Sequence, residues 1–357
     1  MFASVCGCFL LCPCKRYSSG SEDFLRAGKP LCGGWKAALV SVQGDLDFFA
    51  ASLGLPRWSL KEGGCPVCKC KSSGPMTWKK ISPWQHIAGM EWKPQEWLDW
   101  PGRSKCPLFQ AIGVTACSVQ LDWLHVKYLG NDQYLYASVF HLLCFVVLPS
   151  TPVNNLLSMW EEMKTLYKTL GIVHQYRYFN RLTMFQRKSG PPKLRGKGAE
   201  IHHLHKVVLH LWSKHHNHHI TVHRQILTVL KLNSRIEDLL DEHKESVALP
   251  AAAAKELLDA CCSNCSMCHV QSLLFDHFSD EPVQLFNTTL KTHDLIHLAL
   301  HSHQINPRVV WNFCGESYMG ILKFLSANCV KGVAPQDACT KMLHHWSYCT
   351  HCEMQKK

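Results

Sequence analysis

The chain has 357 residues, of which 46% are apolar and 18% are charged. This composition supplies enough apolar side chains for one large domain or two ordinary ones, and it excludes a chain that is disordered throughout. The formal net charge of +11, with 23 histidines counted as neutral, favours nucleic acid or another polyanion as a partner.

The 20 cysteines do not follow the pattern of a small secreted scaffold, because the chain is too long and they cluster in pairs near histidines. We therefore interpret them as reduced thiols, some bound to metal and most of them buried. Residues 1–14 are apolar, but this run is too short to span a bilayer and lacks the basic start of a signal peptide. Residues 1–34 are expected to be Cys-rich and poorly ordered, with palmitoylation as an alternative, and no membrane partner is expected.

An apolar strand is predicted at residues 37–42, and it ends at Gly44. Asp45 follows directly, and helix-forming residues continue to about Gly54. Catalytic acids of α/β sheets tend to lie at this position, after the carboxyl end of a strand. Asp45 is therefore a candidate catalytic carboxylate.

Residues 55–120 have no regular pattern and are rich in tryptophan. Two cysteines in this segment have the spacing of half a zinc knuckle, and an Asp-x-x-His element follows it. The predicted zinc ligands are Cys65, Cys68, Asp122 and His125, with Cys70 and His86 as alternatives to Asp122. The tryptophans are expected to form a small core that zinc stabilises, and stacking on unpaired bases is the alternative.

From Asp122 onward the apolar spacing is helical. Helices are predicted from residue 121 to about Pro149 and at residues 154–170, 220–245, 251–278, 291–303 and 317–329. Histidines crowd residues 200–223, where His215 and His219 have the spacing of a helical metal-binding pair. We favour a polar helix end, because no acidic or cysteine partner accompanies them.

Residues 175–197 carry seven cations and no acid, with aromatic residues between them. Such a run forms either a solvated face or a surface that contacts phosphates, and both interpretations are open. The candidate nucleic-acid-binding residues are Arg177, Arg181, Arg187, Lys188, Lys193, Arg195 and Lys197.

Two further patterns combine cysteine and histidine. Cys265-Ser-Met-Cys268-His269 formally matches a c-type haem attachment site, but the surrounding leucines favour a helix core, and a second metal site is another alternative. His293, His297 and His301 recur at four-residue spacing along the helix predicted at 291–303.

Three carboxylates are candidates for phosphoryl-transfer chemistry, which needs convergent acids to hold divalent cations roughly 3.5–4 Å apart. They are Asp45, Asp122 and Glu316, the last of which opens a late helix. Asp122 and His125 lie one turn apart and share a helix face, which suits a metal-ligand or orienting role. Capping of a helix amino terminus is the alternative role of Asp122.

The order of these motifs resembles the CACTA-type transposases over residues 35–340. The matching motifs are Gly44-Asp45-Leu46, Cys65-Pro-Val-Cys68, Asp122-Trp-Leu-His125 with Leu129-Gly130, Lys291-Thr-His293-Asp-Leu-Ile-His297-Leu298 and Gly315-Glu316-Ser-Tyr-Met319. The resemblance implies an RNase H-like DDE domain interrupted by a helical insertion, with Asp45 as the second catalytic acid and Glu316 as the third. It also implies cleavage and transfer of DNA strands with Mg²⁺ or Mn²⁺, and a structural Zn²⁺ at the cysteine pair.

In that family the first catalytic Asp lies on a strand well before the second, whereas only 44 residues precede Asp45. We therefore expect a mainly α protein with an incomplete RNase H-like α/β core, a large helical insertion and a Cys-rich zinc knuckle. Catalysis is not expected unless a second copy or a complementing chain supplies the missing half. The expected segments are residues 1–34, the Cys-rich start; 35–120, the core remnant with the zinc knuckle; 121–310, the helical insertion; and 311–357, the helices with the last acid.

The alternative function is a non-catalytic, zinc-stabilised module that binds nucleic acid or another protein. A Cys-rich metal buffer is a more remote alternative, which predicts several metal ions per chain. DNA is the expected partner, and the nucleus, otherwise the cytoplasm, is the expected location.

Overall fold

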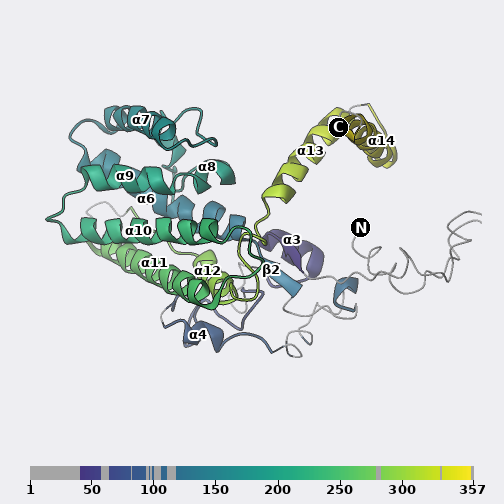
Figure 1. Cartoon of the computed structure of the whole chain (residues 1–357), viewed down its shortest axis with the longest axis horizontal. Coiled ribbons are helices and arrows are strands. Elements are labelled where there is room, and N and C mark those ends of the chain that lie inside the picture. Colours follow the sequence, from purple (N-terminus) through teal and green to yellow (C-terminus); the bar gives the residue numbers. More distant parts are fainter. Residues whose placement is uncertain are drawn as a thin grey trace, which may run out of the picture. The chain divides into compact units, whose positions relative to one another are not determined.

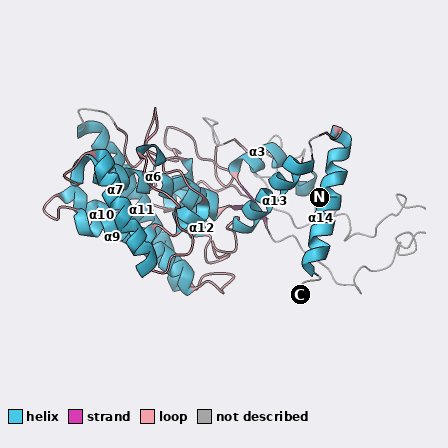
Figure 2. Cartoon of the chain, turned by 90° about the horizontal axis from the view of Figure 1, so that it is seen from above, coloured by secondary structure: helices cyan, strands magenta, loops and turns pink. Residues whose placement is uncertain are grey.

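The structure is a computed structural model that describes residues 41–57, 64–81, 83–93, 96, 99, 106–110, 118–278, 283–329 and 332–354. The described part is mainly helical, as predicted (Figure 2). Its strands form one two-stranded parallel sheet. The chain divides into two compact units between Trp311 and Asn312. The expectations for residues 1–34 and for residues 37–40 of the predicted strand lie outside the described residues.

The sheet pairs β1 (Val42–Gly44) with β2 (Val119–Leu121) in parallel, and Gly44 lies opposite Leu121. Parallel strands have their carboxyl ends at the same edge of a sheet. The next residue of each chain segment is an acid, so Asp45 and Asp122 follow two paired residues at one edge.

Helix α3 (Leu46–Leu53) follows β1 at once because its two ends are well capped. The Asp45 carboxylate accepts a hydrogen bond of 2.6 Å from the Phe48 N–H, which satisfies one of the free amides at the helix start. Gly54, with φ 66°, ends the helix in the left-handed region that favours glycine.

The segment that carries the cysteine pair is irregular, as expected, and two short contacts shape it. An antiparallel bridge joins Cys68 to Glu91, next to α4 (Gln85–Ala88), and a parallel bridge joins Lys71 to Thr77. The Lys69 N–H donates to the Met90 carbonyl (2.9 Å), so the cysteine turn and the residues after α4 are held side by side. The 3₁₀ helix η3 (Pro107–Gln110) lies between this segment and β2.

The rest of the first unit is helical (Figure 1). Its helices are the π-helix η5 (Leu124–Asp132), α6 (Gln133–Leu142), the π-helix η6 (Leu143–Val147), α7 (Pro152–Thr169), the 3₁₀ helix η7 (Leu182–Met184), α8 (Gly198–His202), α9 (His205–His215), α10 (Thr221–Glu242), α11 (Ala251–Phe278) and α12 (Leu290–Leu300). Helix α10 packs against α9 and α11, and α12 packs against α11, η5 and α4. This arrangement places α12 between the helical core and the cysteine segment.

The helix predicted from residue 121 to Pro149 is one run, but it starts and ends with π-helical turns. At the first of these turns Leu129 leaves helical geometry (φ −87°, ψ 18°), which frees carbonyl groups of the helix. Side chains satisfy them: Asn131 donates to the Val126 carbonyl (3.0 Å), and the Lys291 ammonium donates to the Leu129 carbonyl (3.2 Å). The irregular turn thereby anchors the start of α12.

A buried ionic group lies where η5 meets α10, and we call it the Lys127 cluster. The Lys127 ammonium contacts the carboxylates of Asp132 (2.8 Å) and Glu237 (2.7 Å) and donates to the Asn233 side-chain oxygen (2.9 Å). Tyr128 donates to the other oxygen of Glu237 (2.9 Å). Almost every polar atom of this cluster has a partner, as a buried charged group requires.

The second unit contains α13 (Phe313–Cys329) and α14 (Pro335–Met354). The two helices pack together, and the rings of Tyr318 and Trp346 meet edge to face at 5.2 Å between centroids. Of the helices in the described ranges, none combines the length and the apolar character needed to cross a membrane.

Candidate metal centre

Two cysteines and two histidines from distant parts of the first unit meet in the interior, and we call them the metal-binding cluster. It consists of Cys65, Cys68, His293 and His297. All four residues are buried, and their donor atoms lie within 4.8 Å of one another. The His293 Nε2 atom is 3.1 Å from the Cys68 sulfur and 3.1 Å from the His297 Nε2 atom. Four convergent donors of this kind can hold one metal ion.

Local structure brings each pair of donors together. His293 and His297 are four residues apart on α12, so both rings project from one face of the helix. The cysteines lie on a tight turn in which the Val67 N–H donates to the Cys65 sulfur (3.3 Å). An amide that points at a sulfur stabilises negative charge on it, which prepares the turn for thiolate ligands.

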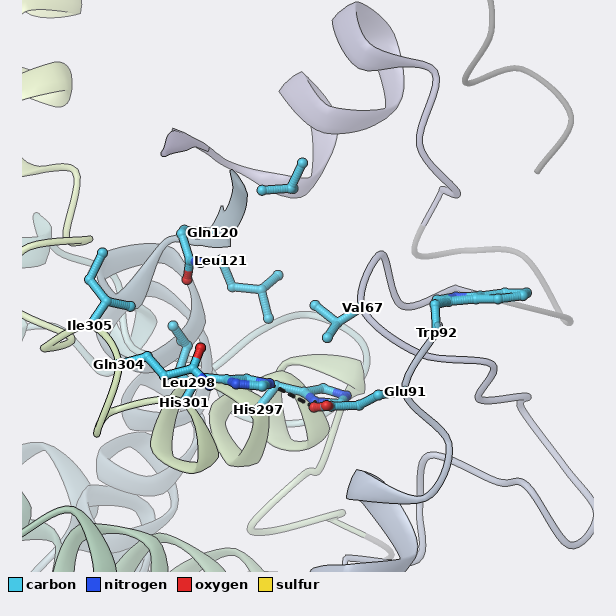
Figure 3. A pocket seen from close by; sticks show the side chains of 11 residues that line it. Val67, Glu91, Trp92, Gln120, Leu121, His297, Leu298, His301, Gln304 and Ile305 are labelled. Atoms are coloured by element: carbon cyan, nitrogen blue, oxygen red, sulfur yellow. Dashed lines mark hydrogen bonds and ion pairs between the residues drawn. The ribbon is translucent and has the colours of Figure 1, made fainter. Parts of the chain in front are cut away.

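Glu91 fixes the orientation of His297 (Figure 3). Its carboxylate lies 2.9 Å from the His297 Nδ1 atom, on the side of the ring that faces away from the cluster. Burial lowers the pKa of His297 to about 4, so the ring is neutral at pH 7. A neutral ring that donates from Nδ1 to Glu91 presents the lone pair of Nε2 to the cluster, which is the arrangement of a metal-bound histidine.

The protein groups inside the metal-binding cluster do not fully balance one another's charges and hydrogen bonds. Burial raises the pKa values of the Cys65 and Cys68 thiols and raises the pKa of Asp294 to about 7. Both Asp294 oxygens and the His293 Nδ1 atom are buried without a close hydrogen-bond partner in the described part of the chain, although the Cys65 thiol lies close enough to lower the Asp294 pKa.

Cys70 supplies a third thiol beside this pair. Hydrogen bonds from Cys65 and Cys68 lower the pKa of Cys70. A bound cation would favour ionised sulfur in the whole group, so the donor set fits a metal ion.

The Asp-x-x-His element lies elsewhere, although it was expected to complete the site of Cys65 and Cys68. The buried Asp122 carboxylate accepts a hydrogen bond from the Leu124 N–H (2.9 Å), and its other oxygen contacts the His125 Nδ1 atom. Asp122 therefore caps a helix start and orients a histidine at the same time. The sequence indicates His293 and His297 by their spacing but does not indicate a partner for them.

Asp122 and His125 line a cavity of about 310 Å³ that also contains Asp45, and we call it the strand-end pocket. The side chains of Lys193 and Lys291 line it as well. Burial and the neighbouring Lys193 lower the pKa of Lys291, while the charges of Asp45 and Asp122 act in the opposite direction. The pocket thus combines carboxylates at the end of a parallel strand pair with two ammonium groups.

Glu316, the other predicted catalytic acid, belongs to the second unit. It lies in the first turn of α13, where its N–H donates to the Asn312 carbonyl (2.9 Å). The Glu316 carboxylate lies near a helix start, where the helix dipole favours negative charge.

The basic stretch between α7 and α8 is largely exposed. Six of its seven predicted nucleic-acid-binding residues are exposed, and Lys193 is half-buried against the Tyr134 ring (5.4 Å). Of its aromatic residues, Tyr178 is exposed, whereas the other three, Tyr176, Phe179 and Phe185, are buried in the core. The cations therefore form an outer surface, but most of the aromatic side chains serve packing.

The other histidine and cysteine patterns have local partners. His215 lies 2.9 Å from the Glu162 carboxylate, so it pairs with α7 rather than with His219. Cys265 is buried in α11, and its thiol points to the Thr292 carbonyl (3.8 Å). In the described residues, neither pattern belongs to a group of three or more converging metal-ligand atoms.

The chain was compared with models of known protein families, with curated proteins and with solved structures, and none of the three comparisons gives a match. The transposase resemblance therefore stays a prediction from the sequence motifs.

Proposed function

We propose that the protein is a zinc-stabilised nucleic-acid-binding protein that takes DNA phosphates into the strand-end pocket. The observation that carries this proposal is the parallel pairing of Gly44 with Leu121, which sets Asp45 and Asp122 at one edge of the sheet, in a pocket that also holds Lys193 and Lys291. Carboxylates hold divalent cations, and ammonium groups attract phosphate, so both halves of a phosphate-binding site are present.

Zinc is the ion that best fits the metal-binding cluster. Two thiolates and two neutral imidazoles are a usual structural zinc set, with Zn–S bonds of about 2.3 Å and Zn–N bonds of about 2.0–2.1 Å. Donors at these bond lengths around a tetrahedral ion lie roughly 3.3–3.8 Å apart, close to the two separations of 3.1 Å that involve His293. Four protein ligands close the site, so the role of the ion is structural: it fastens the cysteine turn to α12.

A divalent cation, Mg²⁺ or Mn²⁺, would be held in the strand-end pocket by Asp45 and Asp122. Such an ion supplies charge that offsets the negative charge of a phosphodiester. His125 keeps the Asp122 carboxylate oriented, and Lys193 and Lys291 also line the pocket, as candidates for contact with the phosphate oxygens. The exposed cations between Arg177 and Lys197 would extend the contact along the nucleic-acid backbone.

The same arrangement supports descent from a DDE transposase with an RNase H-like core, in which acids follow the ends of neighbouring strands. In this proposal β1 and β2 are the remnant of that core, and the helices from η5 to α12 are the insertion. We propose binding rather than cleavage for this chain, with a second copy or a complementing chain as the source of any missing acid. A nuclear location is part of the same proposal.

The experiment measures the affinity of the purified protein for fluorescently labelled double-stranded DNA by anisotropy, with and without Mg²⁺, over a range of salt concentrations. Asp45→Asn is a suitable variant because Asn caps a helix as well as Asp does. Mg²⁺ is expected to tighten DNA binding by the native protein, and this gain is expected to disappear in Asp45→Asn and Asp122→Asn. Asp238→Asn, at a surface ion pair with Lys206, is the matched control and is expected to keep it.

Lys193→Ala tests the phosphate half of the pocket. Its removal is expected to weaken DNA binding at all sequences and to reduce the slope of log affinity against log salt by about 1. Lys168→Ala, an exposed cation on α7, is the control. DNA binding that is unchanged by the substitutions of Asp45, Asp122 and Lys193 would contradict the proposal. Mn²⁺-dependent cleavage that Asp45→Asn abolishes would show that catalysis was wrongly excluded.

A further inference from the structure

A second group of donor atoms lies on the outer side of His297, and we call it the outer cluster. It consists of Glu91, His297 and His301, whose donor atoms lie within 4.8 Å of one another. The same Glu91 oxygen lies 2.9 Å from the His297 Nδ1 atom and 2.7 Å from the His301 Nε2 atom. Figure 3 shows the three side chains directed toward one another.

The outer cluster differs from the metal-binding cluster in its access to solvent. The side chain of His297 is 1% exposed, whereas those of Glu91 and His301 are 25% and 30% exposed. All three line a cavity of about 90 Å³, whose wall also includes Gln120, Trp92 and Gln304 (Figure 3). An ion could therefore enter and leave this cluster without opening the core.

We propose that the outer cluster binds a second, exchangeable transition-metal ion that shares His297 with the proposed structural zinc. Two imidazole nitrogens and one carboxylate favour Zn²⁺, Co²⁺ or Cu²⁺ over Mg²⁺ and Ca²⁺, which prefer all-oxygen sites. Three protein ligands leave a further coordination position, and it faces the cavity. This inference rests on the proposed zinc site, because His297 belongs to both.

The charges and protons of the shared site balance. With the inner ion alone, His297 binds that ion through Nε2, and its Nδ1–H group donates a hydrogen bond to the Glu91 carboxylate. The outer ion takes the place of that proton, which leaves to the solvent, and the ring becomes an imidazolate that bridges the two ions. One negative ring and the Glu91 carboxylate then offset the two positive charges of the outer ion, so the net charge of the outer cluster rises from −1, that of Glu91 alone, to zero.

The distances between the ligand atoms of the outer cluster have to increase only slightly to admit this ion. Ligand atoms at about 2.0–2.2 Å from one tetrahedral ion lie roughly 3.3–3.5 Å apart. The two contacts of Glu91 are 2.9 Å and 2.7 Å, so the carboxylate has to withdraw by a fraction of an ångström to about 1 Å. Its partial exposure allows that movement.

The test is a titration of the full-length, zinc-loaded protein with Co²⁺ after dialysis, with bound metal counted by elemental analysis and released protons counted with a pH indicator. The native protein is expected to keep one zinc through dialysis and to bind one Co²⁺ with release of one proton. The bound Co²⁺ is expected to show ligand-field bands without the thiolate charge-transfer band of a sulfur-bound ion.

Two variants and one control locate the second ion. His301→Ala and Glu91→Gln are expected to weaken Co²⁺ binding at least tenfold while the dialysed zinc stays at one per chain. His303→Ala is the control, since this exposed histidine lies just beyond α12, outside the outer cluster, and contacts the Leu300 carbonyl and the Gln304 side chain. It is expected to bind Co²⁺ like the native protein.

The possible failures are distinguishable. One tight zinc but no Co²⁺ binding, or Co²⁺ binding that His301→Ala leaves unchanged, would overturn the outer site and leave the proposed zinc site intact. Binding without proton release would overturn the bridging His297. Protein that retains no zinc at all, with Cys65→Ser indistinguishable from the native chain, would overturn the zinc proposal and the outer site with it.

Discussion

Two polar clusters are buried in the first unit, and they satisfy their charges in different ways. In the Lys127 cluster, one ammonium group contacts two carboxylates, and a tyrosine and an asparagine complete the hydrogen bonds. In the metal-binding cluster, two thiols and two histidines face one another with no lysine or arginine among them, and an acid, Asp294, lies buried beside them.

The difference separates a cluster that serves packing from one that can hold a metal ion. Burial acts to neutralise Glu237, but Lys127 and two nearby histidines together outweigh it, so the pKa of that carboxyl falls. Burial raises the pKa of Asp132 to about 6, against the attraction of Lys127. For Asp294, burial prevails and its pKa rises to about 7, although His293 acts against the rise. A buried group of protein charges that is already paired predicts no partner, whereas one that lacks a cation predicts a metal ion.

The largest effect is expected from loss of the proposed zinc. Cys65→Ser, or removal of the ion with a chelator, is expected to lower the free energy of unfolding by more than about 4 kcal/mol, because the turn and α12 lose their link. The melting temperature in scanning calorimetry is then expected to fall by about 10 °C or more. Cys314→Ser, an exposed thiol of the second unit, is the control, and an equal fall in that variant would contradict a specific metal site.

The next effect is expected from breaking the Lys127 cluster. Lys127→Met leaves Asp132 and Glu237 buried without their cation, which is expected to cost about 3–5 kcal/mol in urea unfolding. Adding Asp132→Asn and Glu237→Gln removes the unpaired charges and is expected to recover part of that loss. Lys164→Met, at an exposed ion pair, is the control and is expected to change stability by less than about 1 kcal/mol.

Acid is expected to weaken the packing beside the Lys127 cluster through His205. Burial lowers the pKa of His205 to about 4, while the nearby Glu237 acts to raise it. The unfolded histidine titrates at about 6.5, so the folded state binds fewer protons between these values, and stability is lost as the pH falls from about 6.5 to about 4.

His205→Gln removes this proton uptake and keeps a polar group near Ser234, the present partner of the ring at 3.1 Å. Between pH 7.5 and pH 5, the native protein is expected to lose about 2 kcal/mol more than the variant in urea unfolding. Equal losses in the two proteins would mean that His205 is accessible to protons in the folded state.

The smallest effect is expected at the surface. Arg235 contacts the carboxylates of Glu242 (2.5 Å) and Glu256 (2.7 Å), but all three side chains are exposed. Arg235→Ala is expected to change the free energy of unfolding by less than about 1 kcal/mol, and less still in high salt. A larger loss would show that an ionic contact at the surface matters as much as a buried one, which would weaken the comparison.

The sequence predicted the long helices because their apolar spacing is regular, as in α10, where Ile226, Val229 and Leu230 recur on the buried face. It predicted the cysteine pair from local spacing. It did not predict that His293 and His297 meet this pair, because that contact depends on how α12 packs, and no local pattern encodes packing. Their four-residue spacing on a largely apolar helix was the available signal.

The arrangement of the two acids in the strand-end pocket was predicted only in part, because it also depends on long-range packing. A carboxylate after a strand was expected at Asp45, but β2 is only three residues long and gives too short a pattern to recognise. Without it, the sequence offered Asp122 both as an acid that converges with Asp45 and as a zinc ligand beside the cysteines, and no local pattern decided between the two roles. That the two acids are neighbours follows only from the register of the sheet.

The metal-binding cluster joins Cys68 to His293, which are 225 positions apart in the chain. A ribosome that adds about 5–20 residues per second needs on the order of 10–45 s to pass from one to the other. During that interval the nascent chain holds two thiols of the cluster and neither imidazole, so helices α7 to α11 are synthesised before the donor set is complete. Completion of the cluster is therefore a late step of biosynthesis. A chain arrested before α12 would reach the quality-control machinery without the histidines that the cluster needs.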